Sequence, residues 1–234
     1  MARITLGGDR LSGLRIEDPA ASVRLLLPLP GETELVVPEW NGNEFLLPDG
    51  GRPIIRTFTP RRADGDEGEL DLEIVIHGAG AASEWAASAS PGLPAAVSGP
   101  GRGYAVDPEA SEFLLAGDET ALPAIGQLLE ALPPGIPVRV HIEVAHPEAR
   151  QPLPDHPRGT VTWHDLPLGA PPGTAMVAAV TGAGLHPDAR VWVAGEAAAV
   201  QQIRVHLRDR GFPRAHTTVR GYWKHGRGGA PEAD

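Results

Sequence analysis

Arg56-Thr57-Phe58-Thr59-Pro60-Arg61 is the stretch that decides the fold of this chain. It places an aromatic ring between two β-branched threonines, and a guanidinium group stands at either end. Such residues favour a β-strand, and arginine binds planar anionic groups through its forked donors. We expect a strand that presents a flat ring on one face and binds an anionic group on the other.

A loop of small residues follows, His77-Gly78-Ala79-Gly80-Ala81-Ala82-Ser83-Glu84-Trp85, and it opens a predicted helix over residues 83–89. Small residues let backbone N–H groups approach a phosphate, and the helix dipole favours the negative charge. Each stretch alone is weak support, because both patterns also occur in ordinary packing. The two stretches occur in this order and precede a second half that resembles a nucleotide-binding domain. Together they predict a binding site for a flavin dinucleotide.

Up to residue 108 the chain consists of short β-rich runs separated by Pro and Gly, which is typical of an antiparallel barrel. The predicted strands are 23–27, 33–37, 54–59 and 70–76. Residues 70–74 alternate apolar with acidic side chains, so we expect one buried and one solvated face, as in a barrel wall.

From residue 109 the hydrophobic period changes, and predicted strands alternate with predicted helices. The strands are 113–117, 138–144, 160–163, 191–195 and 216–223, and the helices are 121–132, 174–181 and 196–210. This alternation predicts a parallel sheet covered on both faces. The expected fold is an N-terminal antiparallel flavin-binding β-barrel, residues 1–108, followed by a parallel-sheet nucleotide-binding domain, residues 109–227, and a flexible tail, residues 228–234.

Two predicted strands end alike, at Leu115-Ala116-Gly117-Asp118-Glu119-Thr120 and at Val193-Ala194-Gly195-Glu196. In each, a glycine that would let a ligand approach the backbone precedes an acidic residue at a helix start. Ligands of open α/β sheets bind outside the carboxyl ends of the strands, where these carboxylates could bind a ribose hydroxyl. N-capping would equally explain each carboxylate alone. As a pair in one sheet they favour a pyridine-nucleotide site.

Composition narrows the possible functions. Hydrophobic residues make up 41% and charged residues 21%, which is typical of a folded protein. We find no signal segment and no apolar run of the roughly 20 residues that a membrane span needs, so we expect a cytoplasmic protein. Because cysteine is absent, disulfides, thiolate nucleophiles and cysteine-bound iron–sulfur clusters are excluded, and redox chemistry would need an organic cofactor.

Charge and histidine placement exclude two further classes. The net charge of −10 argues against nucleic-acid binding. We predict no metal site, because His141, His146, His156 and His164 are scattered without a ligand spacing and are expected on the surface.

One segment of this acidic chain is basic, and within it Asp209 is the only acidic residue. Its cationic residues are Arg204, Arg208, Arg210, Arg214, Arg220, Lys224 and Arg227. The segment is either a solvated helix face, with arginine favoured near the C-terminal end, or a landing site for a small anion such as a nucleotide phosphate or an acidic metal chelate.

Five stretches together resemble the siderophore-interacting protein family, the flavin-dependent ferric-siderophore reductases of the ferredoxin–NADP reductase-like superfamily. They are Arg56 to Arg61, Ile76 to Ala86, Leu115 to Ile125, Val191 to Glu196 and Tyr222 to Gly226, in the family's order. The resemblance implies an FAD-binding barrel followed by a ferredoxin reductase-like domain that binds NADH or NADPH.

The resemblance also implies site residues. The flavin ring and ribityl chain would lie at Arg56, Phe58 and Thr59, with Thr57 and Arg61 beside them. The pyrophosphate would lie along His77, Gly78, Ala82 and Ser83, near Trp85. NADH or NADPH would face Gly117, Asp118, Glu119, Thr120, Gly195 and Glu196, while Tyr222, Trp223 and Lys224 would lie near the flavin and the iron chelate.

The chain departs from the family's pattern at three points. Phe58 replaces the usual tyrosine, and Ala81 replaces a usual proline. The chain also begins near the family's second strand, so the barrel would have an unpaired edge.

The implied function is that of an NAD(P)H:ferric-siderophore oxidoreductase. NAD(P)H would give a hydride to FAD, and single electrons would then reduce siderophore-bound Fe³⁺ to Fe²⁺, which oxygen ligands release. No catalytic side chain is required, and Arg52, Arg220, Lys224 and Arg227 are predicted to attract the ferric siderophore. The alternatives are a related reductase with another acceptor, namely free flavin, a quinone or ferredoxin, and a non-catalytic flavin-binding module.

Overall fold

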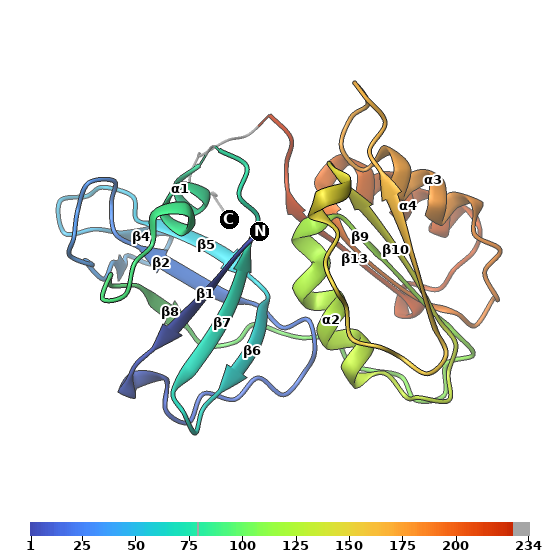
Figure 1. Cartoon of the computed structure of the whole chain (residues 1–234), viewed down its shortest axis with the longest axis horizontal. Helices are drawn as coiled ribbons and strands as arrows, with labels where there is room; N and C mark the ends of the chain where they lie inside the picture. The colour runs from blue at the N-terminus through green and yellow to red at the C-terminus, as the bar shows by residue number, and fades with distance from the viewer. Residues whose placement is uncertain (79, 227–234) are drawn as a thin grey trace. The chain divides into compact units, whose positions relative to one another are not determined.

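The computed structural model describes residues 1–78 and 80–226 (Figure 1). Contacts divide these residues into two compact units, Met1–Tyr104 and Ala105–Gly226. The domain boundary after residue 108 stays a prediction. Arg227 and the tail, residues 228–234, lie outside the described residues.

The N-terminal unit contains two three-stranded antiparallel sheets. The first has the order β1 (Ala2–Gly7), β7 (Glu69–Ile74), β6 (Pro60–Asp64), and the second has the order β5 (Ile54–Phe58), β2 (Val23–Leu27), β8 (Ala96–Ser98). A short hairpin of β3 (Glu39–Trp40) and β4 (Phe45–Leu46), a 3-10 turn η1 (Asp9–Leu11) and helix α1 (Ala81–Ser88) complete the unit.

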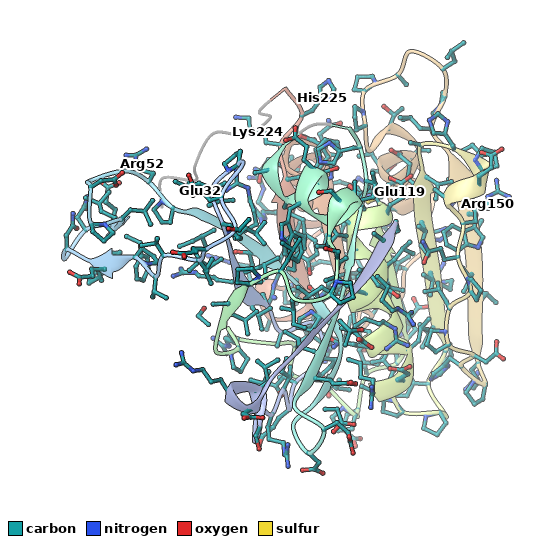
Figure 2. All side chains as sticks on the ribbon, turned by 60° about the vertical axis from the view of Figure 1, so that its left-hand side comes forward. Glu32, Arg52, Glu119, Arg150, Lys224 and His225 are labelled. Atoms are coloured by element: carbon teal, nitrogen blue, oxygen red, sulfur yellow. The ribbon has the colours of Figure 1, made fainter. Side chains whose placement is uncertain are left out.

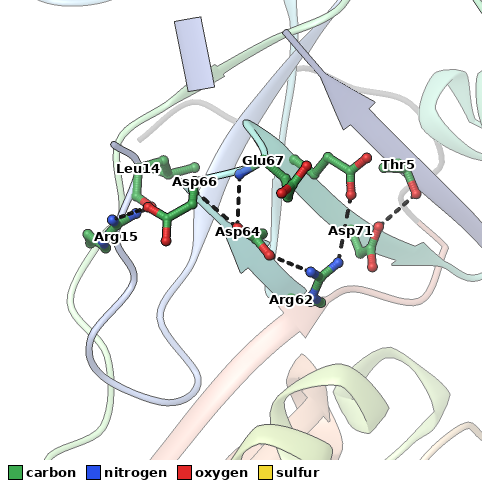
Figure 3. A network of polar contacts seen from close by, with 9 residues as sticks. Thr5, Leu14, Arg15, Arg62, Asp64, Asp66, Glu67 and Asp71 are labelled. Carbon is green, nitrogen blue, oxygen red and sulfur yellow. Dashed lines mark hydrogen bonds and ion pairs between the residues drawn. The ribbon is translucent and has the colours of Figure 1, made fainter. Parts of the chain in front are cut away.

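Both sheets bury one face against a shared core. The side chains of Leu70, Leu72 and Ile74 on β7 meet those of the buried face of β2. The alternating acidic residues point outward, where Asp71 accepts a hydrogen bond from Thr5 at 2.7 Å (Figure 3). The alternation predicted for this stretch is therefore confirmed, because the strand has one buried and one solvated face.

The predicted strand over residues 33–37 is wrong. The chain forms no strand there, and the side chains of Val36 and Val37 are 49% and 66% exposed. β-branched residues favour strands only where a half-buried pleated surface receives them. Pro38 follows at once and has no N–H group to donate to a neighbouring strand.

The C-terminal unit is a five-stranded parallel sheet in the order β11 (Gly159–Asp165), β10 (Val138–Val144), β9 (Phe113–Gly117), β12 (Arg190–Glu196), β13 (Thr217–Trp223). Helix α2 (Leu122–Ala131) lies on one face, and α3 (Thr174–Gly182) and α4 (Ala197–Asp209) lie on the other (Figure 1). Short 3-10 turns are η2 (Glu119–Ala121), η3 (Pro147–Ala149) and η4 (Arg214–His216).

The order of the strands fixes where this sheet can bind a ligand. The chain leaves the central strand β9 toward β10 on one side and later returns to β12 on the other. Loops that leave neighbouring strands in opposite directions open a crevice at the carboxyl edge of a parallel sheet. The switch point of this sheet therefore lies between the ends of β9 and β12. Among the described residues, no helix is long and apolar enough to cross a membrane.

Candidate functional site

Strand β5 contains Arg56, Thr57 and Phe58. The alternation of its side chains corrects the prediction that the aromatic ring and the anion-binding arginine lie on opposite faces of the strand. Arg56 lies opposite Leu25 and Phe58 opposite Val23, and both partners are buried core residues of β2. Residues two apart share a face of a strand. Arg56 and Phe58 therefore lie on the same, core-directed face, and Thr57 lies on the other face and is exposed.

The ring of Phe58 packs against the core together with helix α1. Ala82 and Trp85 of α1 pack against the same core, so three predicted flavin residues border one hydrophobic cluster. The Nε1–H of Trp85 is buried and has no hydrogen-bond partner among the described residues. A buried donor without a partner is costly, and a ligand acceptor would satisfy it.

The loop before α1 leaves the N-terminus of the helix open to an anion. Gly80 occupies the N-cap with φ of 89°, a conformation that favours glycine, and no described side chain caps the helix. A Cβ at Gly78 would meet no atom of the described residues within 4 Å. Ser83 Oγ accepts a hydrogen bond from His77 N at 3.0 Å, which ties the loop to the helix.

These features fit a flavin dinucleotide. No described side chain caps the first N–H groups of α1, which at a helix start can bind an anion. Arg56 Nη1 donates to Ile55 O at 2.8 Å, and the guanidinium has further donors that could bind an anion. Thr59 is buried and Arg61 is half-buried, and both contact other residues. Contact of these side chains with FAD stays a prediction.

Arg52, a predicted siderophore residue, is already paired. Its guanidinium lies 3.0 Å from the carboxylate of Glu44, and both side chains are partly exposed (Figure 2). The pair reduces the charge that Arg52 would offer to an anionic chelate, so its role in binding the siderophore stays a prediction.

In the C-terminal unit, Asp118 lies at the switch point. It is 5% exposed, and its Oδ1 accepts hydrogen bonds from Thr120 N at 2.9 Å and Thr120 Oγ1 at 2.5 Å. Its Oδ2 accepts from Glu196 N at 2.9 Å and from Trp223 Nε1 at 2.8 Å. Burial raises the pKa of Asp118, and these hydrogen bonds oppose the rise.

Two further carboxylates at the same edge, those of Glu196 and Glu119, bind backbone N–H groups. Glu196 caps α4 through Ala199 N at 2.9 Å, and Glu119 accepts from Ala145 N at 2.7 Å. Burial raises the pKa of Glu119, and the nearby charges of Asp118 and Glu143 raise it further. N-capping thus accounts for both Asp118 and Glu196, and their contact with a nucleotide stays a prediction.

The two glycines at the strand ends serve packing within the chain, which corrects the reason given for them. A Cβ on Gly117 would lie 2.3 Å from Ala121 Cβ, and a Cβ on Gly195 would lie 2.6 Å from Asp118 Oδ2. The space that we assigned to an approaching ligand is therefore filled by the protein's own atoms at both positions.

The structure separates the two explanations of the basic segment. Arg204 donates to Val219 O at 2.7 Å, Arg210 donates to Ala183 O at 3.2 Å, and Arg208 pairs with Asp209 at 2.8 Å. These contacts support the helix-face explanation for the part on α4. Arg220 is half-buried and makes contacts of its own, whereas Lys224 is exposed beyond the end of β13 (Figure 2).

Sequence reasoning missed two features of this unit. Glu143, at the end of β10, is 3% exposed and caps α3, with Oε1 accepting from Gly173 N and Oε2 from Ala175 N and Met176 N. A carboxylate ending a buried strand was the available signal. His141 and His164 lie side by side, with Nδ1 and Nε2 3.0 Å apart. Only the pairing of β10 with β11 joins them, and no group of three metal-binding side chains occurs among the described residues.

Family models match nearly all of the chain. A siderophore-interacting FAD-binding domain matches residues 1–104, and a siderophore-interacting protein domain matches residues 110–226. The chain belongs to the siderophore-interacting protein family. The resemblance identified from the sequence is thereby confirmed.

Two curated proteins are similar to most of this chain. An uncharacterized protein of Mycobacterium bovis is 40% identical over 194 residues, which cover 77% of this chain and 69% of that protein. The ferric vibriobactin reductase ViuB of Vibrio cholerae is 28% identical over 164 residues, which cover 70% of this chain and 60% of that protein.

Solved structures agree. The crystal structure of a siderophore utilization protein from T. fusca has a TM-score of 0.83 and 35% identity, and the match covers 96% of this chain and 87% of that one. Phthalate dioxygenase reductase shares the fold, with a TM-score of 0.58 and 16% identity. The match covers 95% of this chain and 62% of the reductase chain. The predicted ferredoxin reductase-like fold class is therefore confirmed.

Proposed function

We propose that this protein is an FAD-dependent NAD(P)H:ferric-siderophore oxidoreductase that works in the cytoplasm, where reduced nicotinamide coenzymes are present. The observation that carries the proposal is that α1 has no described side-chain cap at its N-terminus and borders the same core as Phe58, in a chain matched by an FAD-binding family model. A relative named ferric vibriobactin reductase supports iron chelates as the substrate class.

The proposed flavin site assigns each residue a binding task. The first N–H groups of α1 and the guanidinium of Arg56 would hold the pyrophosphate by charge-assisted hydrogen bonds. The buried Nε1–H of Trp85 would donate to an acceptor of the cofactor, and the ring of Phe58 would give an apolar contact. When bound, FAD would supply the change from hydride transfer to single-electron transfer that Fe³⁺ reduction requires.

The substrate side needs binding and charge rather than acid or base catalysis. Lys224 and Arg220 would attract an anionic ferric siderophore, and a siderophore's hard oxygen ligands hold Fe²⁺ less firmly than Fe³⁺. A ferredoxin partner, free flavin or a quinone would be alternative reaction partners for the same two units. Acceptors compared side by side would decide among them.

The test begins with the full chain reconstituted with FAD. We expect a flavin absorbance spectrum that bleaches anaerobically with NADH or NADPH and recovers when a ferric siderophore is added, while a ferrous chelator traps Fe²⁺. Protein that stays colourless would contradict flavin binding. Bleaching without Fe²⁺ release, but with recovery by a quinone or free flavin, would assign another acceptor.

Arg56→Ala tests the flavin site directly. We expect about a ten- to hundredfold weaker FAD affinity, because a charge-assisted hydrogen bond contributes about 1.5–3 kcal/mol. Arg62→Ala is the matched control, because Arg62 is exposed and pairs with Asp64 on the same strand, β6 (Figure 3). Equal FAD affinities in the two variants, measured by fluorescence titration, would show that Arg56 does not bind the cofactor.

A further inference from the structure

Strand β13 ends in a bulge that redirects Trp223. Gly195 of β12 lies opposite Gly221, but the next residue, Glu196, lies opposite Trp223, so Tyr222 is the extra residue. Bulges break the alternation of side chains and turn a chosen side chain to a new direction, often beside a functional site. Here the ring of Tyr222 lies edge-on to buried Trp192, with ring centroids 6.4 Å apart.

The redirected indole is held by a buried carboxylate. Trp223 Nε1 donates to Asp118 Oδ2 at 2.8 Å, and Asp118 accepts three further hydrogen bonds from Thr120 and Glu196. None of these donors carries a charge. The carboxylate is therefore held by hydrogen bonds alone, and each one, including that of the indole, gains strength from its burial.

The same hydrogen bond spans the switch point. Asp118 follows β9, Glu196 ends β12 and Trp223 ends β13, so three strand ends meet at one side chain. Trp223 is only half-buried at the edge where open α/β sheets bind nucleotides, and the ring of His225 lies edge-on to it with the centroids 6.3 Å apart. A fixed aromatic ring offers a stacking surface at little entropic cost.

We propose that Asp118 is a positioning residue that fixes the indole of Trp223, and that the fixed ring is the surface on which the nicotinamide ring of the donor stacks. The inference rests on the proposed function, because it assumes a nicotinamide donor. It gives Asp118 a task other than the ribose contact predicted from sequence. The oxidised ring of NAD⁺ or NADP⁺ is a cation, which the face of an indole attracts, whereas the reduced ring of the donor is neutral and would make an apolar contact.

The test uses the full chain reconstituted with oxidised FAD and the oxidised coenzymes NAD⁺ and NADP⁺, which bind without turnover. Trp223→Phe keeps a ring but removes the N–H donor, and Asp118→Asn removes the carboxylate. We expect each variant to weaken coenzyme binding about three- to tenfold in calorimetry, the range that one lost hydrogen bond gives. Trp163→Phe, on the opposite edge strand β11, should bind as the wild type does.

The double variant decides whether Asp118 acts through Trp223. If it does, Asp118→Asn should cause no further loss of affinity in the Trp223→Phe background, because the interaction is already absent. Fully additive losses would overturn the proposal. Trp223→Phe keeps the other hydrogen bonds of Asp118 and so carries the test if Asp118→Asn fails to fold.

A spectroscopic readout tests positioning without any coenzyme. In ¹⁵N-labelled protein, the indole N–H resonance that disappears in Trp223→Phe should shift in Asp118→Asn. An unshifted resonance would overturn the proposal. Wild-type protein that binds neither coenzyme would overturn the nicotinamide donor and this inference together, whereas wild-type affinity in Trp223→Phe would overturn this inference alone.

Discussion

Lys224 is the only lysine in the sequence, and its ammonium group is exposed just beyond β13. The surrounding molecule is acidic, with a net charge of −10, so an anionic chelate needs a local cation to approach. Among the predicted siderophore residues, Arg52 is paired with Glu44 and Arg220 makes contacts of its own. Of the predicted siderophore residues that the structure describes, Lys224 is therefore expected to contribute most of the attraction, and Arg227 lies outside the described residues.

We predict that Lys224→Gln raises the KM for an anionic ferric siderophore about three- to fivefold, as expected for one partly screened charge pair, and leaves kcat nearly unchanged. Lys224→Arg should keep the wild-type KM, because the charge is retained. Steady-state reduction of an anionic and a neutral chelate would measure the effect. An equal rise in KM for the neutral chelate would exclude electrostatic attraction.

The faces predicted for Phe58 and Arg56 were wrong. We expected the two side chains on opposite faces of a strand, but residues two apart share a face. Both lie toward the core, opposite Val23 and Leu25. The period of the strand was sufficient to predict this. That Phe58 and Trp85 of α1 pack against one core was not predictable, because it depends on how the helix lies on the sheet.

Among the elements, α3 depends on a carboxylate from another element. Its N-cap is Gly173, which has no side chain, and its first turn contains no acidic residue. Glu143 of β10 supplies the missing acceptors through three hydrogen bonds of 2.5 to 3.0 Å. A negative charge at this position also favours the helix dipole.

We predict that Glu143→Gln lowers the free energy of unfolding by about 1–3 kcal/mol, because the amide keeps one acceptor oxygen and loses the charge. Urea denaturation would measure the loss, and hydrogen exchange should quicken at the amides of Ala175 and Met176. Glu148→Gln, on the exposed turn η3, is the control. A control variant destabilised as much as Glu143→Gln would refute the capping role.

The pair of β10 and β11 joins two imidazoles. Burial lowers the pKa of His141, and the charges of His164 and Arg139 lower it further. Below the unfolded pKa of 6.5 the unfolded chain takes up a proton that the folded chain resists, so stability falls as pH falls. Above that pH both states are neutral at this residue, and the full stability is present.

We predict that the wild type loses more unfolding free energy than His141→Gln does as pH falls from about 7.5 to about 5.5. The extra loss should be up to about 1 kcal/mol. Urea denaturation at several pH values would measure it. His146→Gln, on an exposed residue, is the control and should follow the wild type. A pH-independent difference would show that the His141–His164 contact does not titrate in this range.

At the scale of the whole molecule, several carboxylates lie close to the predicted nucleotide site. Asp118, Glu119, Glu143 and Glu196 all lie at the carboxyl edge of the parallel sheet, within a chain of net charge −10. A 2′-phosphate brings further negative charge to this edge. The resulting repulsion is of the order of 1 kcal/mol at the effective dielectric of a protein surface.

We therefore predict that kcat/KM is higher for NADH than for NADPH, about fivefold at low ionic strength, and that the preference weakens as salt screens the charges. Glu119→Gln should reduce it, because Glu119 is half-buried at this edge. Anaerobic flavin reduction by each coenzyme would measure the ratio. A preference for NADPH would mean that cationic side chains outweigh these carboxylates.

Much of the fold was predictable from local patterns. Strands β9 and β10 begin and end where predicted, because buried parallel strands are nearly continuous apolar runs bounded by turn residues. Residues 33–37 have strand-forming composition without a buried face, and they form no strand. The motif around Phe58 and the loop before α1 identified the family, which the family models confirm.

The sequence by itself determined the class of fold, the family and which segments could bind a cofactor, because periodicity, turn residues and short motifs are local. Only the tertiary structure decided what those residues contact. In the structure, Asp118 and Glu196 accept hydrogen bonds from backbone N–H groups, and Trp223 donates to Asp118. The space next to Gly195 is filled by the side chain of Asp118. Hydrogen bonds between distant residues depend on strand order and register, which no local pattern contains.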